Sequence, residues 1–78
     1  MERTIDGDVR FRILKLLKRK NKKGDNMIFT IDDIMTKASI TEYEKLTIHG
    51  WLDLNSGRDS PFGIRREHHG TRAFFTRD

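Results

Sequence analysis

The chain has 78 residues, which suits one domain and is too short for two. Only 35% of the residues are hydrophobic and 36% are charged, so we expect a thin core beneath a heavily charged surface. The absence of cysteine excludes disulfides and cysteine-based metal sites, and we expect neither a membrane span nor a signal peptide. The prediction is a single domain over residues 1–78, cytoplasmic (nucleoid-associated) or nuclear and not secreted.

The net charge of +4 is unevenly distributed along the chain. Residues 1–30 carry nine cations and four carboxylates, whereas residues 31–56 carry two cations and five carboxylates. Residues 57–78 carry five cations and three carboxylates, so basic ends flank an acidic middle. The positive total favours a polyanionic partner, most simply nucleic acid, while the acidic middle opposes that interpretation.

The first apolar pattern has a helical period. Residues 1–7 are expected to form a flexible lead-in, followed by a helix over residues 8–22 that Asp6 or Asp8 caps. Its inward stripe comprises Val9, Ile13, Leu16 and Leu17. The five cations within residues 18–23 have two interpretations: favourable charges at a helix C-terminus and in a solvated loop, or a patch for nucleic acid or another partner.

A short strand and a short helix are predicted next. Residues 27–29 are apolar and β-prone, and they lead directly into a helix over residues 31–37. Thr30 stands where a helix cap is needed, and Asp33 follows three residues later, which is the spacing of a capping box.

A longer helix is predicted over residues 41–54. Ser39 and Glu42 repeat the capping spacing before it, and the tight turn between the two helices indicates a helix-turn-helix. Its apolar arc is wide enough to be covered from two sides, and Tyr43 and Trp51 are assigned to the core. The remaining polar strip holds Glu42, Lys45, His49 and Asp53.

Residues 62–77 are predicted to form a β-hairpin. A two-residue turn at 69–70 pairs Ile64 with Phe75, Arg66 with Ala73 and Glu67 with Arg72. The core face then comprises Phe62, Ile64, Ala73 and Phe75. A three-residue turn at 68–70 remains an alternative, and it would shift the pairing by one residue.

From about Asp8 to Arg77, the order of elements is helix, short strand, helix, helix, strand, strand. Together with the Phe29–Ile34 segment and the terminal hairpin, this order resembles the winged-helix family of helix-turn-helix domains. The resemblance implies an α+β fold with three helices, a short strand and a C-terminal hairpin, called the wing. It also implies that the short strand pairs with the wing, that the third helix enters the major groove, and that the wing contacts the minor groove or phosphates.

The wing carries four arginines and one acid, with a glycine at its tip. Guanidinium groups suit phosphates and a narrow minor groove, although arginines that only keep a hairpin soluble are the alternative. The acids of the third helix repel phosphate, so the wing and the first helix would supply most of the attraction. The candidate DNA-binding residues are Arg65, Arg66, His68, His69 and Arg72 in the wing, and Thr41, Lys45 and His49 in the third helix.

No pattern indicates catalysis. The sequence has no glycine-rich phosphate loop and no nucleophile paired with a base, so we expect no enzymatic activity and no cofactor. His68 and His69 are neighbours that point to opposite faces of a strand, and His49 lies in another element, so no metal site is expected.

The favoured hypothesis is a double-stranded DNA-binding module, a small transcriptional regulator, with the wing on the backbone or minor groove. The alternative is a winged-helix module that binds another protein through its acidic third helix and the edge formed by Phe11 and Leu14. The same edge is the candidate surface for a homodimer. Binding of RNA or of single strands is less favoured, because only Phe74 stands as an exposed aromatic beside an arginine.

Overall fold

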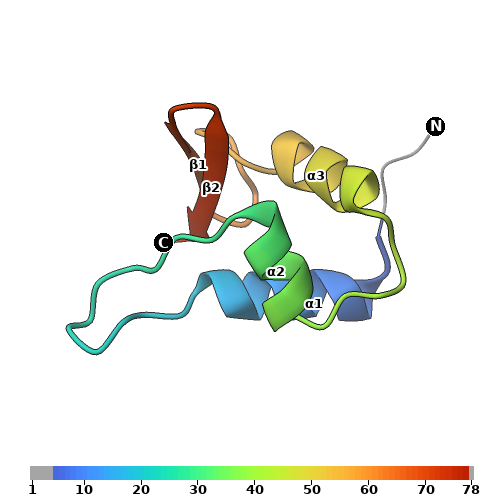
Figure 1. Cartoon of the computed structure of the whole chain (residues 1–78), viewed down its shortest axis with the longest axis horizontal. Coiled ribbons are helices and arrows are strands. Elements are labelled where there is room, and N and C mark those ends of the chain that lie inside the picture. Colours follow the sequence, from blue (N-terminus) through green and yellow to red (C-terminus); the bar gives the residue numbers. More distant parts are fainter. Residues whose placement is uncertain (1–4, 78) are drawn as a thin grey trace.

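A computed structural model describes residues 5–77 and shows an α+β arrangement of three helices and one antiparallel hairpin (Figure 1). The elements are α1 (Gly7–Leu17), α2 (Ile31–Lys37), α3 (Lys45–Leu54), β1 (Ile64–His69) and β2 (Arg72–Arg77). The two strands form one sheet, and the layout is compatible with a winged helix. Residues 1–4 of the expected lead-in lie outside the described residues, whereas the expectation is wrong for the rest: Ile5 is buried in the core, Asp6 is the N-cap of α1 and Gly7 begins the helix.

The predicted stripe of α1 is confirmed, since Val9, Ile13, Leu16 and Leu17 are all buried. Asp6 caps the helix by accepting a hydrogen bond from the N–H of Val9 at 3.0 Å. The helix ends at Leu17, however, and not at residue 22 as expected. The cations beyond it belong to a turn instead, which projects from the body at one end of the molecule (Figure 1).

A pair of backbone hydrogen bonds joins β2 to the segment that precedes α2. The N–H of Phe29 donates to the carbonyl of Phe75 at 2.9 Å, and the N–H of Phe75 donates back at 2.7 Å. The Thr76 hydroxyl adds a hydrogen bond to the carbonyl of Met27 at 2.8 Å. The strand expected over residues 27–29 is therefore one bridge at Phe29, and it lies beside β2 as the resemblance implied.

The prediction for α2 is confirmed at both ends. Thr30 accepts from the N–H of Asp33 at 3.1 Å, and the Asp33 carboxylate accepts from the N–H of Thr30 at 3.2 Å. This reciprocal pair is a capping box, which satisfies two amide groups that the helix itself leaves without partners. Ile31 and Ile34 then face the core.

The start of α3 differs from the prediction. The helix begins at Lys45 and not at residue 41, and its N-cap residue, Glu44, makes no side-chain capping bond. Ser39 takes a left-handed conformation with φ of 54°, and the Glu42 carboxylate accepts from the N–H of Thr41 at 3.0 Å. The expected capping pair therefore does not form, because both residues serve the turn.

The segment between α2 and α3 is held by Arg12. Its Nη1 donates to the carbonyls of Ala38 and Ser39 at 3.1 and 2.9 Å, and its Nη2 forms ion pairs with Glu42 and with Asp8. Arginine alone offers this fork of donors, which can satisfy turn carbonyls and a carboxylate together. Arg12 thus fixes the entry into α3.

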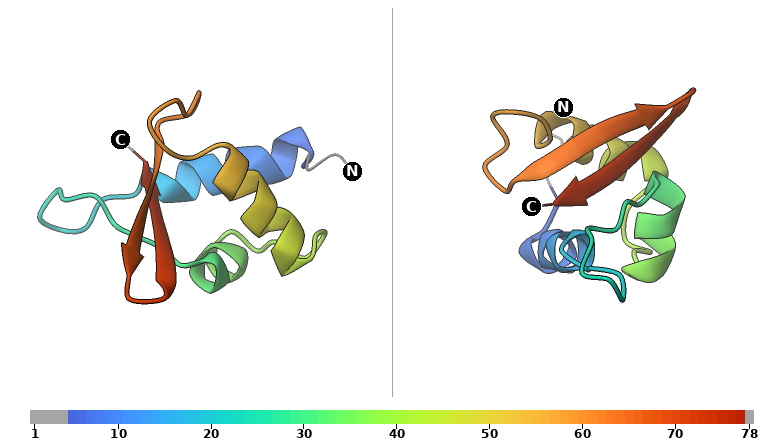
Figure 2. Two further views of the ribbon diagram at one scale, coloured as in Figure 1. Left: turned by 90° about the horizontal axis from the view of Figure 1, so that it is seen from above. Right: turned by 90° about the vertical axis from the view of Figure 1, so that its left-hand side faces the viewer.

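The wide apolar arc of α3 is only partly buried. Trp51 belongs to the core as expected, and Tyr43 packs against it while its hydroxyl accepts from the N–H of Asp6 at 3.0 Å. Leu46 and Leu54 are 73% and 69% exposed, so the expectation of coverage from two sides is wrong. The hairpin and α3 lie on the same side of α1 (Figure 2), and Leu46 and Leu54 lie on α3 where the other described residues leave it exposed.

The hairpin turns at Gly70 and Thr71, one residue later than either predicted turn. Ile64 therefore pairs with Arg77, and Glu67 faces Phe74, so the predicted Glu67–Arg72 pair does not form. The shift from the two-residue-turn register is two places, which preserves the faces of both strands. The core face is confirmed, with Ile64 and Phe75 buried and with Phe62 and Ala73 packed against the core.

Removing the Phe75 ring should destabilise the domain more than any change at an exposed aromatic. We expect Phe75→Ala to lower the free energy of unfolding by about 3–5 kcal/mol, because the ring is fully buried. Phe11→Ala is the control, since that side chain is 63% exposed, and it should change stability by about 0.5 kcal/mol or less. Urea denaturation followed by circular dichroism measures both, and equal effects would contradict the core described above.

The contacts of the Glu42 carboxylate with Arg12 and with the Thr41 N–H should make the free energy of unfolding depend on pH. The pKa of Glu42 is lowered, first because its carboxylate accepts from the Thr41 N–H and also because Arg12 donates to it. The stabilisation from these contacts is complete above the pKa that Glu42 has in the unfolded chain. It is lost as pH falls through the lower pKa that Glu42 has in the folded protein.

Glu42→Gln should therefore lose stability relative to the wild type at neutral pH and approach it in acid. Urea midpoints at a series of pH values measure this convergence. Glu44→Gln is the control, because within residues 5–77 the Glu44 side chain forms no ion pair. A constant difference between the Glu42 variant and the wild type at all pH values would contradict the assignment.

Candidate functional site

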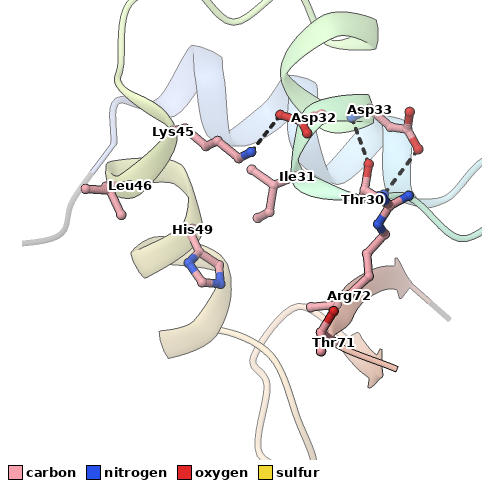
Figure 3. Close-up of a pocket in the computed structure, with 10 residues that line it drawn as sticks. Thr30, Ile31, Asp32, Asp33, Lys45, Leu46, His49, Thr71 and Arg72 are labelled. Carbon is pink, nitrogen blue, oxygen red and sulfur yellow. Dashed lines mark hydrogen bonds and ion pairs between the residues drawn. The ribbon is translucent and has the colours of Figure 1, made fainter. Parts of the chain in front are cut away.

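An open hollow of about 670 Å³ lies where α2, α3 and the hairpin turn approach one another (Figure 3). Of the predicted DNA-binding residues, it brings together Lys45, His49 and Arg72. Its other lining residues, which sequence reasoning did not select, are Thr30, Ile31, Asp32, Asp33, Leu46, Thr71 and Ala73. The site thus combines a helix face with the tip of the hairpin, the two elements singled out from the sequence.

Lys45 stands at the start of α3 and pairs with α2. Its Nζ lies 2.9 Å from Oδ1 of Asp32, and both side chains are exposed (Figure 3). The pair ties the first turns of the two helices together across one wall of the hollow. An exposed pair of this kind contributes about 0–1 kcal/mol, so the lysine can exchange this partner for a ligand anion at small cost.

Asp53 connects α3 with the hairpin. Its Oδ2 lies 3.3 Å from Nε2 of His49, and its Oδ1 lies 2.5 Å from Nη1 of Arg66. Two predicted binding residues therefore share one carboxylate. The i, i+4 spacing of His49 and Asp53 on a helix was visible in the sequence, but the reach of Arg66 to the same carboxylate depends on how the hairpin packs.

Arg72 stands at the beginning of β2, beside the hairpin turn. Its side chain is exposed and points across the hollow toward the first turn of α2 (Figure 3). Within the described part of the chain, no carboxylate forms an ion pair with it. Of the wing arginines, Arg72 is the one that lines the hollow.

The other predicted wing residues occupy different surroundings. His69 lies 3.6 Å from the Glu67 carboxylate and packs edge-on against Phe74, with ring centroids 5.0 Å apart. His68 and Arg65 are exposed on β1 and lie outside the hollow. Arg77 donates from Nε to the carbonyl of Phe62 at 2.6 Å and from Nη1 to that of Leu14 at 3.3 Å. Arg77 is therefore a structural residue.

Thr41 does not belong to α3. It is exposed four residues before the helix begins, in the segment held by Arg12, and it does not line the hollow. Its expected place at the N-terminal end of the third helix is wrong, because that helix starts at Lys45.

The formal charges of α3, of the hairpin and of the residues that line the hollow cancel once Arg77, which is bound to backbone carbonyls, is set aside. Four cations, Lys45, Arg65, Arg66 and Arg72, accompany four carboxylates, Asp32, Asp33, Asp53 and Glu67. Three of these carboxylates lie within ion-pair distance of a lysine, arginine or histidine, which weakens the field that a polyanion would meet at long range. The surface favours short-range contacts with a ligand more than long-range attraction.

Residues 5–77 also bear on metal binding and on membrane insertion. No three histidine, aspartate or glutamate side chains there converge to hold a metal ion. In the same range, no helix combines the length and apolar character that crossing a bilayer requires. Comparison with known proteins returned no similarity: no family model, no curated protein and no solved structure matches the chain.

Replacing Asp53 tests whether its ion pairs hold the fold or only occupy the surface. Asp53→Asn should change the free energy of unfolding by about 1 kcal/mol or less, because His49, Arg66 and Asp53 are all partly exposed. Asp59→Asn is the control, because it removes one carboxylate from the loop before β1. If chemical denaturation shows a large loss for Asp53→Asn alone, Arg66 is a structural strut and is not available to a ligand.

Proposed function

We propose that the protein is a double-stranded DNA-binding module of the winged-helix type, acting as a small transcriptional regulator. The observation that carries the proposal is the convergence of α3 and the hairpin tip on one open hollow, with Arg72 exposed at its edge. In this mode of binding, α3 lies in the major groove and the hairpin contacts the backbone or minor groove.

The exposed face of α3 offers side chains for base contacts. A major groove about 12 Å wide admits one α-helix, and α3 exposes Lys45, Leu46 and Asp53 while leaving His49 partly accessible. Lysine donates to guanine, a carboxylate accepts from the cytosine amino group, and an apolar side chain contacts the thymine methyl. The mixed character of this face therefore supports reading of bases more than non-specific attraction.

The hairpin supplies the phosphate contacts. Arg72 has no ion pair to break among the described residues, and its guanidinium can donate two parallel hydrogen bonds to one phosphate. Arg66 would exchange Asp53 for a phosphate oxygen, and the exposure of that pair keeps the cost of exchange small. Because the carboxylates balance the cations, affinity should rest on a few such contacts.

A second candidate function is favoured by the apolar side chains that α3 exposes. Leu46 and Leu54 are both largely open to solvent, and large exposed apolar side chains on one helix suit a protein partner. In this alternative the same winged-helix body binds another protein without direct contact to DNA. The proposed homodimer through α1 has weaker support, since Phe11 is exposed but Leu14 packs against the core.

Arg72→Ala should weaken binding to duplex DNA and reduce its dependence on salt. Loss of one phosphate contact lowers the slope of log K against log salt by about 0.9, because one fewer counterion is released. Arg10→Ala removes the same charge from the exposed face of α1, away from the hollow, and should leave the slope unchanged. Fluorescence anisotropy titrations at several salt concentrations measure both variants.

Two outcomes of this experiment count against the proposal. If the wild type fails to bind a duplex at tens of micromolar in low salt, the protein-partner alternative is favoured. If Arg72→Ala and Arg10→Ala weaken binding equally, the interaction depends only on net charge and the hollow is not the site.

A further inference from the structure

The turn between α1 and α2 carries a net charge equal to that of the whole chain. Residues 18–26, named here the basic turn, carry five cations and one carboxylate, a net charge of +4. The whole chain also carries +4, so the remaining 69 residues sum to zero. All nine residues of the basic turn are exposed, and within residues 5–77 none of its five cations forms an ion pair.

The basic turn has a defined shape. The carboxamide oxygen of Asn21 accepts from the N–H of Lys23 at 2.8 Å and from that of Asp25 at 3.0 Å. The backbone of Asn21 also bonds to Asp25 and Gly24, and Gly24 takes the positive φ of 84° that the reversal requires. Lys20 and Asn26 form a bridge at its base. The lysines are thus displayed on a folded ribbon, which reduces the entropy lost on binding.

Its composition identifies the kind of partner. The basic turn contains no apolar or aromatic side chain, whereas protein interfaces are enriched in aromatic residues and depleted of lysine. It lacks the apolar side chains that would insert into a membrane, and it lacks an aromatic surface on which unpaired bases could stack. Asn21 and Asn26 use their carboxamide oxygens within the turn. The remaining groups are cations suited to the phosphates of a duplex.

The position of the basic turn extends the proposed interface. Along the long axis of the molecule, the hairpin lies between α3 at one side and the basic turn at the other (Figures 1 and 2). A duplex that runs along this axis would pass α3, the hairpin and then the basic turn. Contacts of the basic turn would therefore fall on DNA backbone outside the base pairs that α3 contacts.

We propose that the basic turn is a second, sequence-independent binding site for the phosphate backbone of duplex DNA, with Lys22 and Lys23 at its centre. This inference rests on the proposed function, since it assigns to the turn the long-range attraction that the balanced α3 and hairpin surface lacks. Phosphate contacts position a protein without carrying sequence information, so the basic turn contributes affinity and not selectivity.

The test compares Lys22→Gln/Lys23→Gln with the control Arg10→Gln/Lys37→Gln, which removes the same charge from exposed positions on α1 and α2. Binding to two duplexes of unrelated sequence is measured by anisotropy across a salt series. The basic-turn variant should lose about two units of salt slope, so between about 50 and 200 mM salt its affinity falls roughly tenfold less than that of the wild type. The loss of affinity should be equal for both duplexes, and the control should retain the wild-type slope.

Each remaining outcome overturns the inference in a recognisable way. If the wild type binds duplex and the basic-turn variant keeps its slope, the inference fails while the proposed function stands. If the wild type binds no duplex at low salt, both fail together. Phosphatidylcholine vesicles containing phosphatidylserine serve as the second probe: binding to them that requires Lys22 and Lys23, with duplex binding unchanged, would assign the turn to a membrane surface.

Discussion

One pair of backbone hydrogen bonds, between Phe29 and Phe75, holds β2 against the segment that leads into α2. A two-stranded ribbon is marginal in water by itself, so this one needs the body as a third partner. The rings of both phenylalanines are buried on the same side, and Ile64 joins them from β1. Together with the hydrogen bond from the Gly57 N–H to the Ile64 carbonyl, this attachment positions the hairpin beside α2 and α3. The position of the proposed interface is therefore a property of the core, although its side chains are on the surface.

Local signals predicted the fold well wherever a short segment determines its own structure. The capping box of Thr30 and Asp33 and the stripe from Val9 to Leu17 are of this kind. The errors occurred where a distant residue intervened. Arg12 binds the carbonyls before α3 and engages Glu42, so the helix starts late, and the end of α1 is set by a turn that closes on Asn26. The residues before α3 and those after α1 carry no sequence pattern that would indicate these contacts.

The candidate site was predicted at the level of elements and less well at the level of residues. The sequence indicated that α3 and the hairpin would act together, and the structure brings Lys45, His49 and Arg72 to one hollow. Charge counting could not show that Asp53 would lie between His49 and Arg66, because this depends on the crossing of helix and strand. The balance of charges around the hollow in turn explains why the lysines beyond α1, first interpreted in two ways, become important for the electrostatics of the whole molecule.

The concentration of charge in the basic turn has a consequence for diffusion. The molecule measures 39 × 24 × 23 Å, and its excess charge projects from one end of the long axis (Figure 1). A body charged in this way experiences a torque in the field of a polyanion and rotates before contact, so that encounters begin with a preferred end. Salt would shorten the range over which this alignment acts, because the screening length falls from about 30 Å at 0.01 M to about 10 Å at 0.1 M. The charge distribution therefore gives the molecule a preferred orientation in a strong electric field.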